Sequence, residues 1–358
     1  MSTLAKTMLA LMYHGPLDIR LEERPVPRPG PGEVLLQVAA ATTCGTDLKA
    51  YRRGHPVLFR TIPSSFGHEV AGVVAAIGAG ITNCQPGDAV VAANSAPCQT
   101  CFFCRKGRFS LCEDLYLLNG AYAEYLLIPE RIARLNLYPL PAGTSFAAAA
   151  LGEPLACALH GLDEVNRDET VAILGAGPLG LLLAAGAKQW GARVIITGHG
   201  AERLNLARHF GADVVLDTEG LSAEEQGEAV RRETEGGRGA DVVIEAVGLP
   251  EIWELAATLV RRGGLVVFFG GCAAGTTVSL QTRPLHYDEL TLKGVFHHTP
   301  AHFARAVTLI GSGTINVEAL ISARLPLSSA LEAFQLLQRK QGVKYALIPP
   351  AFAEQLRP

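Results

Sequence analysis

The sequence has no long unbroken hydrophobic run and almost no excess of either charge, and both absences exclude classes of protein. Its 358 residues carry a net charge of −3 with a pI near 6.4, whereas a nucleic-acid-binding domain is usually strongly basic. The apolar stretch Val171–Ala187 contains five glycine and proline residues and is short for a membrane span. We therefore expect neither a nucleic-acid partner nor a membrane partner.

The N-terminus also lacks the features of a secretory signal. Met1–Tyr13 contains one lysine, Lys6, but no sustained apolar core. Glycine and proline are spread without a repeat, which excludes collagen and low-complexity chains. We expect a soluble, globular, cytoplasmic protein. At roughly 100–200 residues per domain, the length predicts about two domains.

Four of the eight cysteines fall close together. Disulfide frameworks belong to small secreted chains, whereas four thiolates at short spacing can surround Zn²⁺ at Zn–S distances of about 2.3 Å. With every position filled by protein, such a zinc has no place for water or substrate and is structural. Four free cysteines in a loop are the alternative. The predicted ligands follow the pattern C-x2-C-x2-C-x7-C and are Cys98, Cys101, Cys104 and Cys112.

The first half of the chain alternates apolar runs with glycine and proline, from about Gly32 to Ala93. This pattern predicts strands separated by turns, and hence a β-rich, barrel-like domain. Strands are expected at Val34–Ala40, Glu69–Ile77 and Ala89–Ala92.

From about Glu169 to Val295, apolar strands alternate with helical stretches instead. Such alternation predicts the α/β class, with a parallel sheet covered by helices on both faces. The C-terminal part holds two helical patterns and a short strand, Tyr345–Ile348, and could complete either domain. The strands expected here are Val171–Leu174, Val194–Thr197, Val214–Leu216, Val242–Ala246 and Leu265–Gly270, and the helices are Leu179–Trp190 and Glu202–Phe210.

A glycine motif lies at the first strand of this α/β region. Gly175 permits a tight turn, Gly177 lets a pyrophosphate approach the backbone, and Gly180 lets the helix pack on the strand. The helix that opens with Pro178 and Leu179 offers free backbone N–H groups and a partial positive charge to phosphates. The motif predicts a dinucleotide site, with a purely structural turn as the alternative.

The end of the second strand bears on the choice of cofactor. An NAD site usually has an acidic residue here that bonds the ribose 2′-OH, but this chain has no acid before Glu202. Thr197, His199 and Arg203 could instead bind a 2′-phosphate, unless Arg203 is only a solvated helix residue. We expect NADP(H) to be favoured, with NAD(H) as the other possibility.

Candidate ligands for a second zinc lie in the β-rich half. Cys44, His68 and Glu69, together with Glu153, supply a thiolate, an imidazole and carboxylates. A catalytic zinc uses about three protein ligands and keeps one position open. An ordinary core histidine beside an apolar strand is the alternative interpretation of His68.

These motifs together resemble the zinc-dependent medium-chain dehydrogenase/reductase family, in its alcohol, sorbitol and threonine dehydrogenase-like branch. The resemblance covers the chain from near residue 8 to near 350. It implies a GroES-like catalytic domain (1–150) with the structural zinc lobe, a Rossmann cofactor domain (151–295), a C-terminal return to the first domain (296–358), and a homodimer or homotetramer. The matching elements are Cys44–Asp47, Gly67–Glu69, Pro86–Asp88, the four-cysteine lobe, Gly120–Tyr125, Glu153–Pro154 and the glycine motif.

The resemblance also implies roles for single residues. Cys44 and His68 would bind the catalytic zinc, and either Glu69 or Glu153 would complete the ligand set, giving two zinc ions per chain. Thr46 would relay a proton from the substrate. Many relatives have a histidine three residues after this threonine, whereas this chain has Lys49. Lys344 would reach the pyrophosphate of the cofactor, or it is a surface lysine.

The function implied is hydride transfer between a secondary alcohol and a nicotinamide cofactor. A substrate of polyol, sugar or cyclitol type is favoured, and an L-threonine or simple alcohol dehydrogenase is the alternative. A zinc-free reductase of enones or quinones and an inactive nucleotide-binding protein are alternatives from other classes. The zinc ligand set argues against both.

Overall fold

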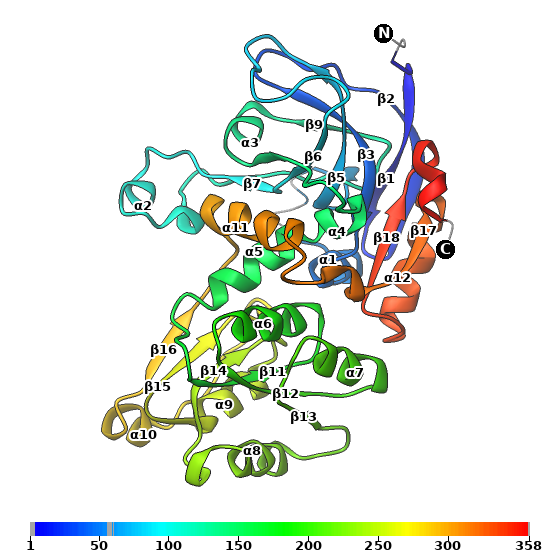
Figure 1. Cartoon of the computed structure of the whole chain (residues 1–358). Coiled ribbons are helices and arrows are strands. Elements are labelled where there is room, and N and C mark those ends of the chain that lie inside the picture. The colour runs from blue at the N-terminus through cyan, green and yellow to red at the C-terminus, as the bar shows by residue number, and fades with distance from the viewer. Residues whose placement is uncertain (1–3, 56–58, 60, 357–358) are drawn as a thin grey trace. The chain divides into compact units, whose positions relative to one another are not determined.

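The computed structural model describes residues 4–55, 59 and 61–356 (Figure 1). The chain divides into two compact units, and the second is inserted into the first. The first unit comprises Met1–Ala156 and His298–Pro358, and the second comprises Cys157–His297. The first boundary falls inside helix α5 (Gly152–Gly161).

The first unit is built on antiparallel strands. Its largest sheet has the strand order β10-β6-β5-β3-β18-β17, with β9 also paired to β3. The smaller sheets are β2-β1-β4 and β7-β8. The strands are β1 (Thr7–Gly15), β2 (Asp18–Pro25), β3 (Val34–Thr42), β4 (Ser64–Ser65), β5 (Glu69–Ile77), β6 (Ala89–Ala92), β7 (Ser95–Ala96), β8 (Tyr116–Leu117), β9 (Tyr125–Ile128), β10 (Leu137–Pro139), β17 (Ile321–Pro326) and β18 (Lys344–Ile348).

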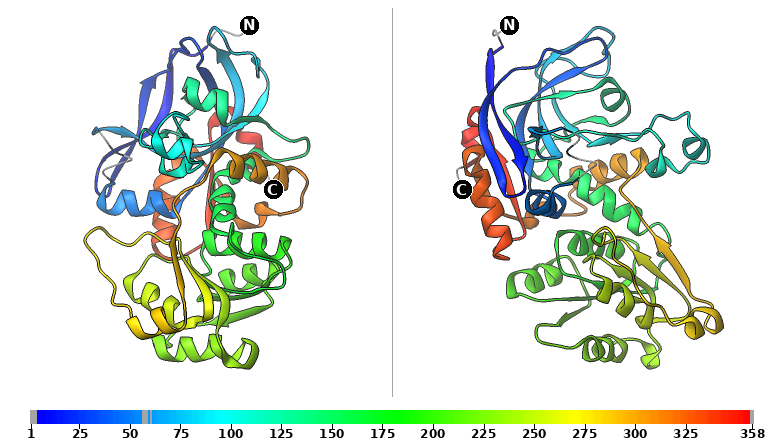
Figure 2. Two further views of the ribbon diagram at one scale, coloured as in Figure 1. Left: turned by 90° about the vertical axis from the view of Figure 1, so that its left-hand side faces the viewer. Right: turned by 180° about the vertical axis from the view of Figure 1, so that it is seen from behind.

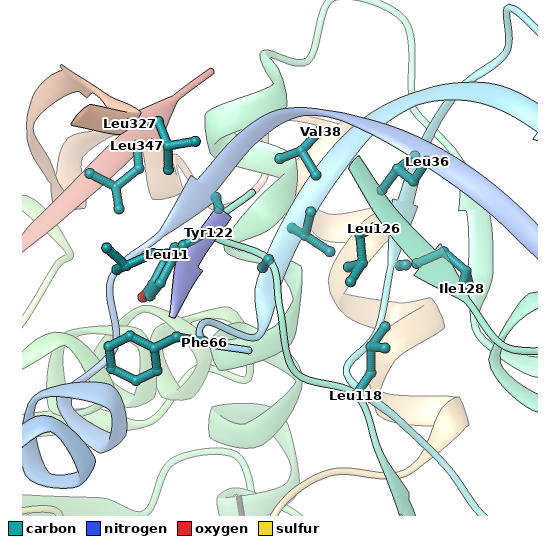
Figure 3. Close-up of a cluster of buried hydrophobic side chains, with 14 of the residues drawn as sticks. Leu11, Leu36, Val38, Phe66, Leu118, Tyr122, Leu126, Ile128, Leu327 and Leu347 are labelled. Carbon is teal, nitrogen blue, oxygen red and sulfur yellow. The ribbon is translucent and has the colours of Figure 1, made fainter. Parts of the chain in front are cut away.

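The core of this unit lies between its sheets and helices. Strand β3 has the sequence VLLQVAAAT and is almost entirely buried, as its apolar run predicts. Leu36, Val38, Phe66 and Tyr122 belong to one cluster of buried side chains (Figure 3). The helices of the unit are α1 (Gly45–Arg53), α2 (Phe102–Arg105), α3 (Glu130–Leu135), α4 (Phe146–Ala150), α11 (Pro300–Gly311) and α12 (Ala330–Gln338).

The C-terminal segment completes the sheet of the first unit. Strand β18 pairs antiparallel with β3, with Leu347 opposite Ala41, and parallel with β17. Figure 2 shows this segment, in red and orange, beside the blue strands of the N-terminal part. The sequence left open which domain the C-terminus joins, and the structure assigns it to the first.

The second unit is a six-stranded parallel sheet of order β13-β12-β11-β14-β15-β16. Its central strands carry short apolar runs, Val171–Leu174 and Val242–Ile244, as expected of strands that helices cover on both faces. Helices α6 and α7 lie on one face and α8 and α9 on the other (Figure 1), which confirms the predicted α/β Rossmann class. The elements are β11 (Thr170–Leu174), α6 (Pro178–Gln189), β12 (Arg193–Gly198), α7 (Ala201–His209), β13 (Val214–Asp217), α8 (Ala223–Arg232), β14 (Ala240–Glu245), α9 (Pro250–Leu259), β15 (Val260–Phe268), α10 (Thr282–Tyr287) and β16 (Thr291–Gly294).

Two features of the first unit differ from what the sequence pattern indicates. The hairpin of β1 and β2 was not predicted, because β2 reads DIRLEERP and its charges hide the alternation of a strand. The polar residues Tyr51–Arg53, which no sequence pattern marked as helical, form the last turn of α1, and Gly54 is its C-cap. Across the described ranges, no helix combines the length and apolar character that a membrane crossing requires.

Candidate metal centres and cofactor pocket

A thiol, an imidazole and a carboxylate meet where β3 and β5 run side by side. The pairing of these strands places Thr42 opposite Glu69. Cys44, two residues after Thr42, therefore lies near His68 and Glu69 at the start of β5. The ligand atoms of Cys44, His68 and Glu69 all lie within 4.8 Å of one another. Three of the predicted ligands of the catalytic zinc are therefore brought together by strand register.

Helix α1 supports the thiol of this group. Cys44 is the N-cap of α1, and its Sγ accepts a hydrogen bond of 3.4 Å from the backbone N–H of Thr46. The N-terminus of a helix favours negative charge, which suits a thiolate. The side chain of Thr46 lies in the exposed first turn of the same helix, next in the chain to the predicted metal ligands.

His68 is oriented by a buried acid that follows the cysteine by three residues. Its Nδ1 donates to Oδ1 of Asp47 over 2.9 Å, and Asp47 is fully buried. Burial by itself lowers the pKa of His68. The carboxylate of Asp47 outweighs this effect, so among protein charges alone the pKa lies well above the usual range of histidine. The bond leaves Nε2 as the metal-binding nitrogen, as in other histidine sites with an outer carboxylate.

Glu69 is paired with the one lysine predicted to bind the cofactor. Lys344 is 1% exposed, and its Nζ donates to both carboxylate oxygens of Glu69, at 2.6 and 2.7 Å, and to the carbonyl of Thr43. Burial lowers the pKa of Lys344, but Glu69 and Cys44 raise it above the ordinary lysine value. The alternative of a surface lysine is therefore wrong, and contact with a pyrophosphate stays a prediction.

Glu153 lies in a different polar cluster. Asn94 donates to its Oε1 over 3.1 Å, and Nε2 of His298 donates to Oδ1 of Asn94 over 3.2 Å. All three side chains are buried. The structure therefore groups Glu69, and not Glu153, with Cys44 and His68. Sequence reasoning missed Asn94 and His298, because no local motif marks residues that are 204 positions apart.

The donors at the first centre fit zinc. Zn²⁺ is a borderline-soft ion that binds thiolate, imidazole and carboxylate together, and catalytic sites use three protein ligands. Cys44, His68 and Glu69 supply one donor of each kind, and Asp47 adds the outer carboxylate that such sites usually have. The chemistry of the set is that of a catalytic rather than a structural site.

The four remaining predicted ligands form a second centre around α2. The sulfurs of Cys98 and Cys104 are 3.9 Å apart, and those of Cys101 and Cys112 are 4.0 Å apart. Four sulfurs around one zinc ion lie about 3.8 Å from each other, whereas a disulfide requires about 2.05 Å. None of the four is in a disulfide, so the arrangement fits a structural zinc.

The thiols of this lobe differ in their electrostatic surroundings. Backbone and side-chain hydrogen bonds from Thr100 lower the pKa of Cys98 to about 6. Burial raises the pKa of Cys104 to about 12. A bound cation is needed to hold all four as thiolates at neutral pH, because the protein alone favours ionisation of only part of the set.

The glycine motif lines a pocket of about 400 Å³ in the second unit. Gly175 has a φ of +115°, and a Cβ on Gly180 would lie 1.8 Å from the Gly175 carbonyl oxygen. Gly177 is the N-cap of α6, and a Cβ there would meet nothing within 4 Å. The open side of Gly177, with Pro178 and Leu179 in the first turn of α6, is the geometry expected of a phosphate site.

The pocket continues to the end of β12. Thr197, His199 and Arg203 all line it, and no acidic residue does so in the described part of the chain. Arg203 is half-buried, and burial lowers its pKa even though Glu202 acts in the opposite direction. The three residues proposed for the cofactor's ribose therefore face the same space as the glycine motif.

Comparisons with known proteins agree with this geometry. The chain matches an alcohol dehydrogenase GroES-like domain over residues 30–142 and a zinc-binding dehydrogenase domain over residues 178–312. Sorbitol dehydrogenase of Homo sapiens is 33% identical over 348 residues, which is 95% of each chain. The structure of alcohol dehydrogenase TADH from Thermus sp. ATN1 has a TM-score of 0.85 and 32% identity, covering 96% of this chain and 100% of that one. A protein of Sinorhizobium meliloti 1021, described as a zinc-binding dehydrogenase bound to NADP, has a TM-score of 0.86 and 31% identity with the same coverage.

Proposed function

Because the chain belongs to the zinc-binding medium-chain dehydrogenase family, we propose that it oxidises a secondary alcohol of polyol, sugar or cyclitol type. Membership makes it an alcohol or polyol dehydrogenase that uses zinc and a nicotinamide cofactor. The observation that carries the proposal is the group of Cys44, His68 and Glu69 in a chain that also has a dinucleotide pocket.

The residues of the first centre have separate tasks in this reaction. Cys44, His68 and Glu69 would hold the zinc, and a bound zinc would supply a Lewis acid for the alcohol oxygen. Asp47 accepts a hydrogen bond from Nδ1 of His68 and so presents Nε2. The hydroxyl of Thr46 would take up the proton of the alcohol while it releases its own proton outward, and a bound nicotinamide cofactor would accept the hydride.

The choice of Glu69 over Glu153 as the third ligand rests on the 4.8 Å grouping. Lys344 and the hydroxyl of Thr42 both bond the Glu69 carboxylate, so they orient its oxygens and offset its charge. Glu153 would act through its own neighbours, Asn94 and His298. The similarity to sorbitol dehydrogenase over 95% of each chain supports a polyol substrate over a simple alcohol.

We propose NADP(H) as the preferred cofactor, with NAD(H) as the second candidate. The support is a pocket lined by Thr197, His199 and Arg203 without an acid at the position where NAD sites bond the ribose 2′-OH. The ratio of kcat/KM values for the two cofactors tests this. A clear preference for NAD⁺ would contradict it.

The metal content and one substitution test the reaction. We expect about two zinc ions per chain by elemental analysis, and Cys44→Ser should lose the catalytic zinc and its turnover while the far-ultraviolet circular dichroism stays unchanged. Serine is a poorer zinc ligand than cysteine but nearly the same size, so the fold is a fair control. Full turnover by a Cys44→Ser protein with only the structural zinc would refute the mechanism.

A panel of substrates tests the alcohol class and the alternatives. Polyols, sugars, cyclitols, L-threonine and simple alcohols are each offered with NAD⁺ and NADP⁺. We expect the highest kcat/KM with a polyol, sugar or cyclitol. L-threonine or a simple alcohol as best substrate would replace that class. Cofactor binding without any turnover would favour an inactive nucleotide-binding protein.

The assembly remains a proposal as well. The family resemblance supports a homodimer or homotetramer built through the cofactor units. Light scattering of the purified chain distinguishes these assemblies from a monomer.

A further inference from the structure

The buried Asp47 carboxylate is held on both of its oxygens. Oδ1 accepts from Nδ1 of His68 over 2.9 Å, and Oδ2 accepts from the hydroxyl of Tyr122 over 2.5 Å. The first contact is expected beside a zinc-binding histidine. The second comes from a loop 75 residues away in the chain and has no role in the mechanism described above.

Tyr122 has little freedom to move. Its side chain is fully buried and lies near Phe66 (Figure 3). The centroids of these two rings are 5.4 Å apart in an edge-to-face arrangement, and the centroid of the Phe334 ring lies 6.0 Å away. A Cβ on Gly67 would lie only 2.7 Å from the ring, so the residue before His68 packs directly against it.

The backbone links the two segments in the same place. The N–H groups of Gly120 and Ala121 donate to the carbonyl of Gly67, and that of Tyr122 donates to the carbonyl of Phe66. These backbone hydrogen bonds fix the segment of Tyr122 against the segment that carries His68. The Tyr122 hydroxyl then bonds Asp47 directly.

The phenol has one proton and two acceptors within reach. Besides Oδ2 of Asp47, the carbonyl of Thr42 lies 3.1 Å from the hydroxyl oxygen. The Asp47 contact is shorter and charge-assisted, and such bonds are roughly twice as strong as neutral ones. The hydroxyl of Tyr122 therefore donates its proton to Oδ2 of Asp47. If the carboxylate rotated away from His68, this hydrogen bond would be lost.

We propose that Tyr122 is a positioning residue for the catalytic zinc. Its hydroxyl fixes the plane of the Asp47 carboxylate, which in turn fixes the tautomer and the ring orientation of His68. This inference rests on the proposed function only in that the catalytic zinc is bound by His68. It assigns a new task to a tyrosine that is otherwise a core side chain.

The test is Tyr122→Phe, which removes the hydroxyl and keeps the ring. Outer partners of metal ligands typically contribute about 10–100-fold in metal affinity, and we expect a loss near the lower limit, about tenfold. The measurement is zinc retained per chain against increasing chelator. The zinc of the four cysteines serves as the internal reference and should be unaffected.

Tyr13→Phe is the matched control. Tyr13 is a buried tyrosine of the same cluster, with its ring stacked on Phe59 at 3.9 Å, and it does not bond Asp47. This variant should keep its catalytic zinc as firmly as the unchanged chain. An equal loss in both variants would mean that general packing, and not the hydroxyl, retains the metal, and would overturn the proposal.

Two further measurements separate positioning from structure. With Co²⁺ in the catalytic site, Tyr122→Phe should shift the visible absorption bands, which report ligand geometry, while Tyr13→Phe should not. In an Asp47→Asn background, Tyr122→Phe should change zinc retention little further, because both act through one carboxylate. Additive losses, or unchanged bands, would refute the proposal. If the unchanged chain holds only one zinc, the proposed function fails instead.

Discussion

Arg203 and Lys344 are both cations removed from water, yet their neighbours give them different tasks. Lys344 is fully buried, and Glu69 balances its charge. Arg203 lines the cofactor pocket, and burial lowers its pKa. A cation held in such a pocket favours an anionic ligand, and the 2′-phosphate of NADP supplies one.

The first prediction follows from this contrast. Arg203→Ala should lower kcat/KM for NADP⁺ by about tenfold to a hundredfold, because a hydrogen bond to a charged group contributes about 1.5–3 kcal/mol. The value for NAD⁺ should change little, since NAD⁺ has no 2′-phosphate. Steady-state kinetics with both cofactors provide the measurement.

Arg208→Ala is the control for the first prediction. Arg208 lies on the same helix, is exposed, and bonds Asn205. The Arg208→Ala substitution should leave kcat/KM unchanged for both NADP⁺ and NAD⁺. Equal losses for NAD⁺ and NADP⁺ in Arg203→Ala would show that the arginine does not read the phosphate.

At the scale of elements, the turn between β11 and α6 assigns different physical tasks to its glycines. Gly180 lets the helix approach the turn closely, because any Cβ would meet the Gly175 carbonyl oxygen at 1.8 Å. Gly177 leaves open space instead. One glycine therefore serves the fold and the other serves the ligand.

The second prediction separates these tasks. Gly180→Ala should lower the free energy of unfolding by about 1–3 kcal/mol, as overpacking usually does. Gly177→Ala should keep the unfolding free energy within about 0.5 kcal/mol. Its cofactor dissociation constant should nevertheless rise at least about tenfold, since backbone bonds to a phosphate are lost.

Urea unfolding and cofactor titration of both variants provide the measurements. Tight cofactor binding by Gly177→Ala would show that the pyrophosphate does not approach the backbone at this glycine.

At the scale of the whole molecule, the two ends of the chain meet in one sheet. Strand β18 joins β3, and Lys344 reaches across to Glu69, 275 residues away. The pair is buried, so in the zinc-free chain the loss of Lys344 would leave the Glu69 carboxylate without a counter-ion, whereas a bound zinc would supply another cation. Removing one partner of a buried ion pair costs much more stability than removing one partner of a surface pair.

The third prediction concerns this pair. In the zinc-free chain, Lys344→Met should lower the free energy of unfolding by about 3–5 kcal/mol, the usual cost of removing one partner of a buried pair. Lys293→Met is the control, because its pair with Glu164 is partly exposed and should contribute at most about 1 kcal/mol. Equal losses in the two variants would contradict the argument.

The pH dependence of that difference is the fourth prediction. In the zinc-free chain, Glu69 and Cys44 hold the pKa of the buried Lys344 above the ordinary lysine value, so its contribution is complete below about pH 10.4. It is lost as the pH rises through the raised pKa. The stability difference between the unchanged chain and Lys344→Met should therefore be constant from about pH 7 to about pH 9, which lies well below the lysine value of about 10.4. The difference should shrink above about pH 10.4. A difference that shrinks already below pH 9 would contradict the sign.

Much of the fold could be predicted because it depends on neighbouring residues. The parallel sheet of the second unit follows from short apolar runs separated by helical patterns. The strand β2 could not be predicted in this way, because it is held by pairing with β1 and its own residues are mostly charged, with only Ile19 buried. Helix α1 was missed in its last turn for a similar reason: polar residues such as Arg52 and Arg53 read equally well as loop.

The sequence by itself determined the four-cysteine lobe and the glycine motif, since spacing over a few residues is enough to place their groups together. Only the tertiary structure decided which acid joins Cys44 and His68, why Lys344 is buried, and that Tyr122 stands behind Asp47. The physical reason is distance along the chain. Contacts between segments 75 to 275 residues apart arise from strand register and core packing, which no local pattern encodes.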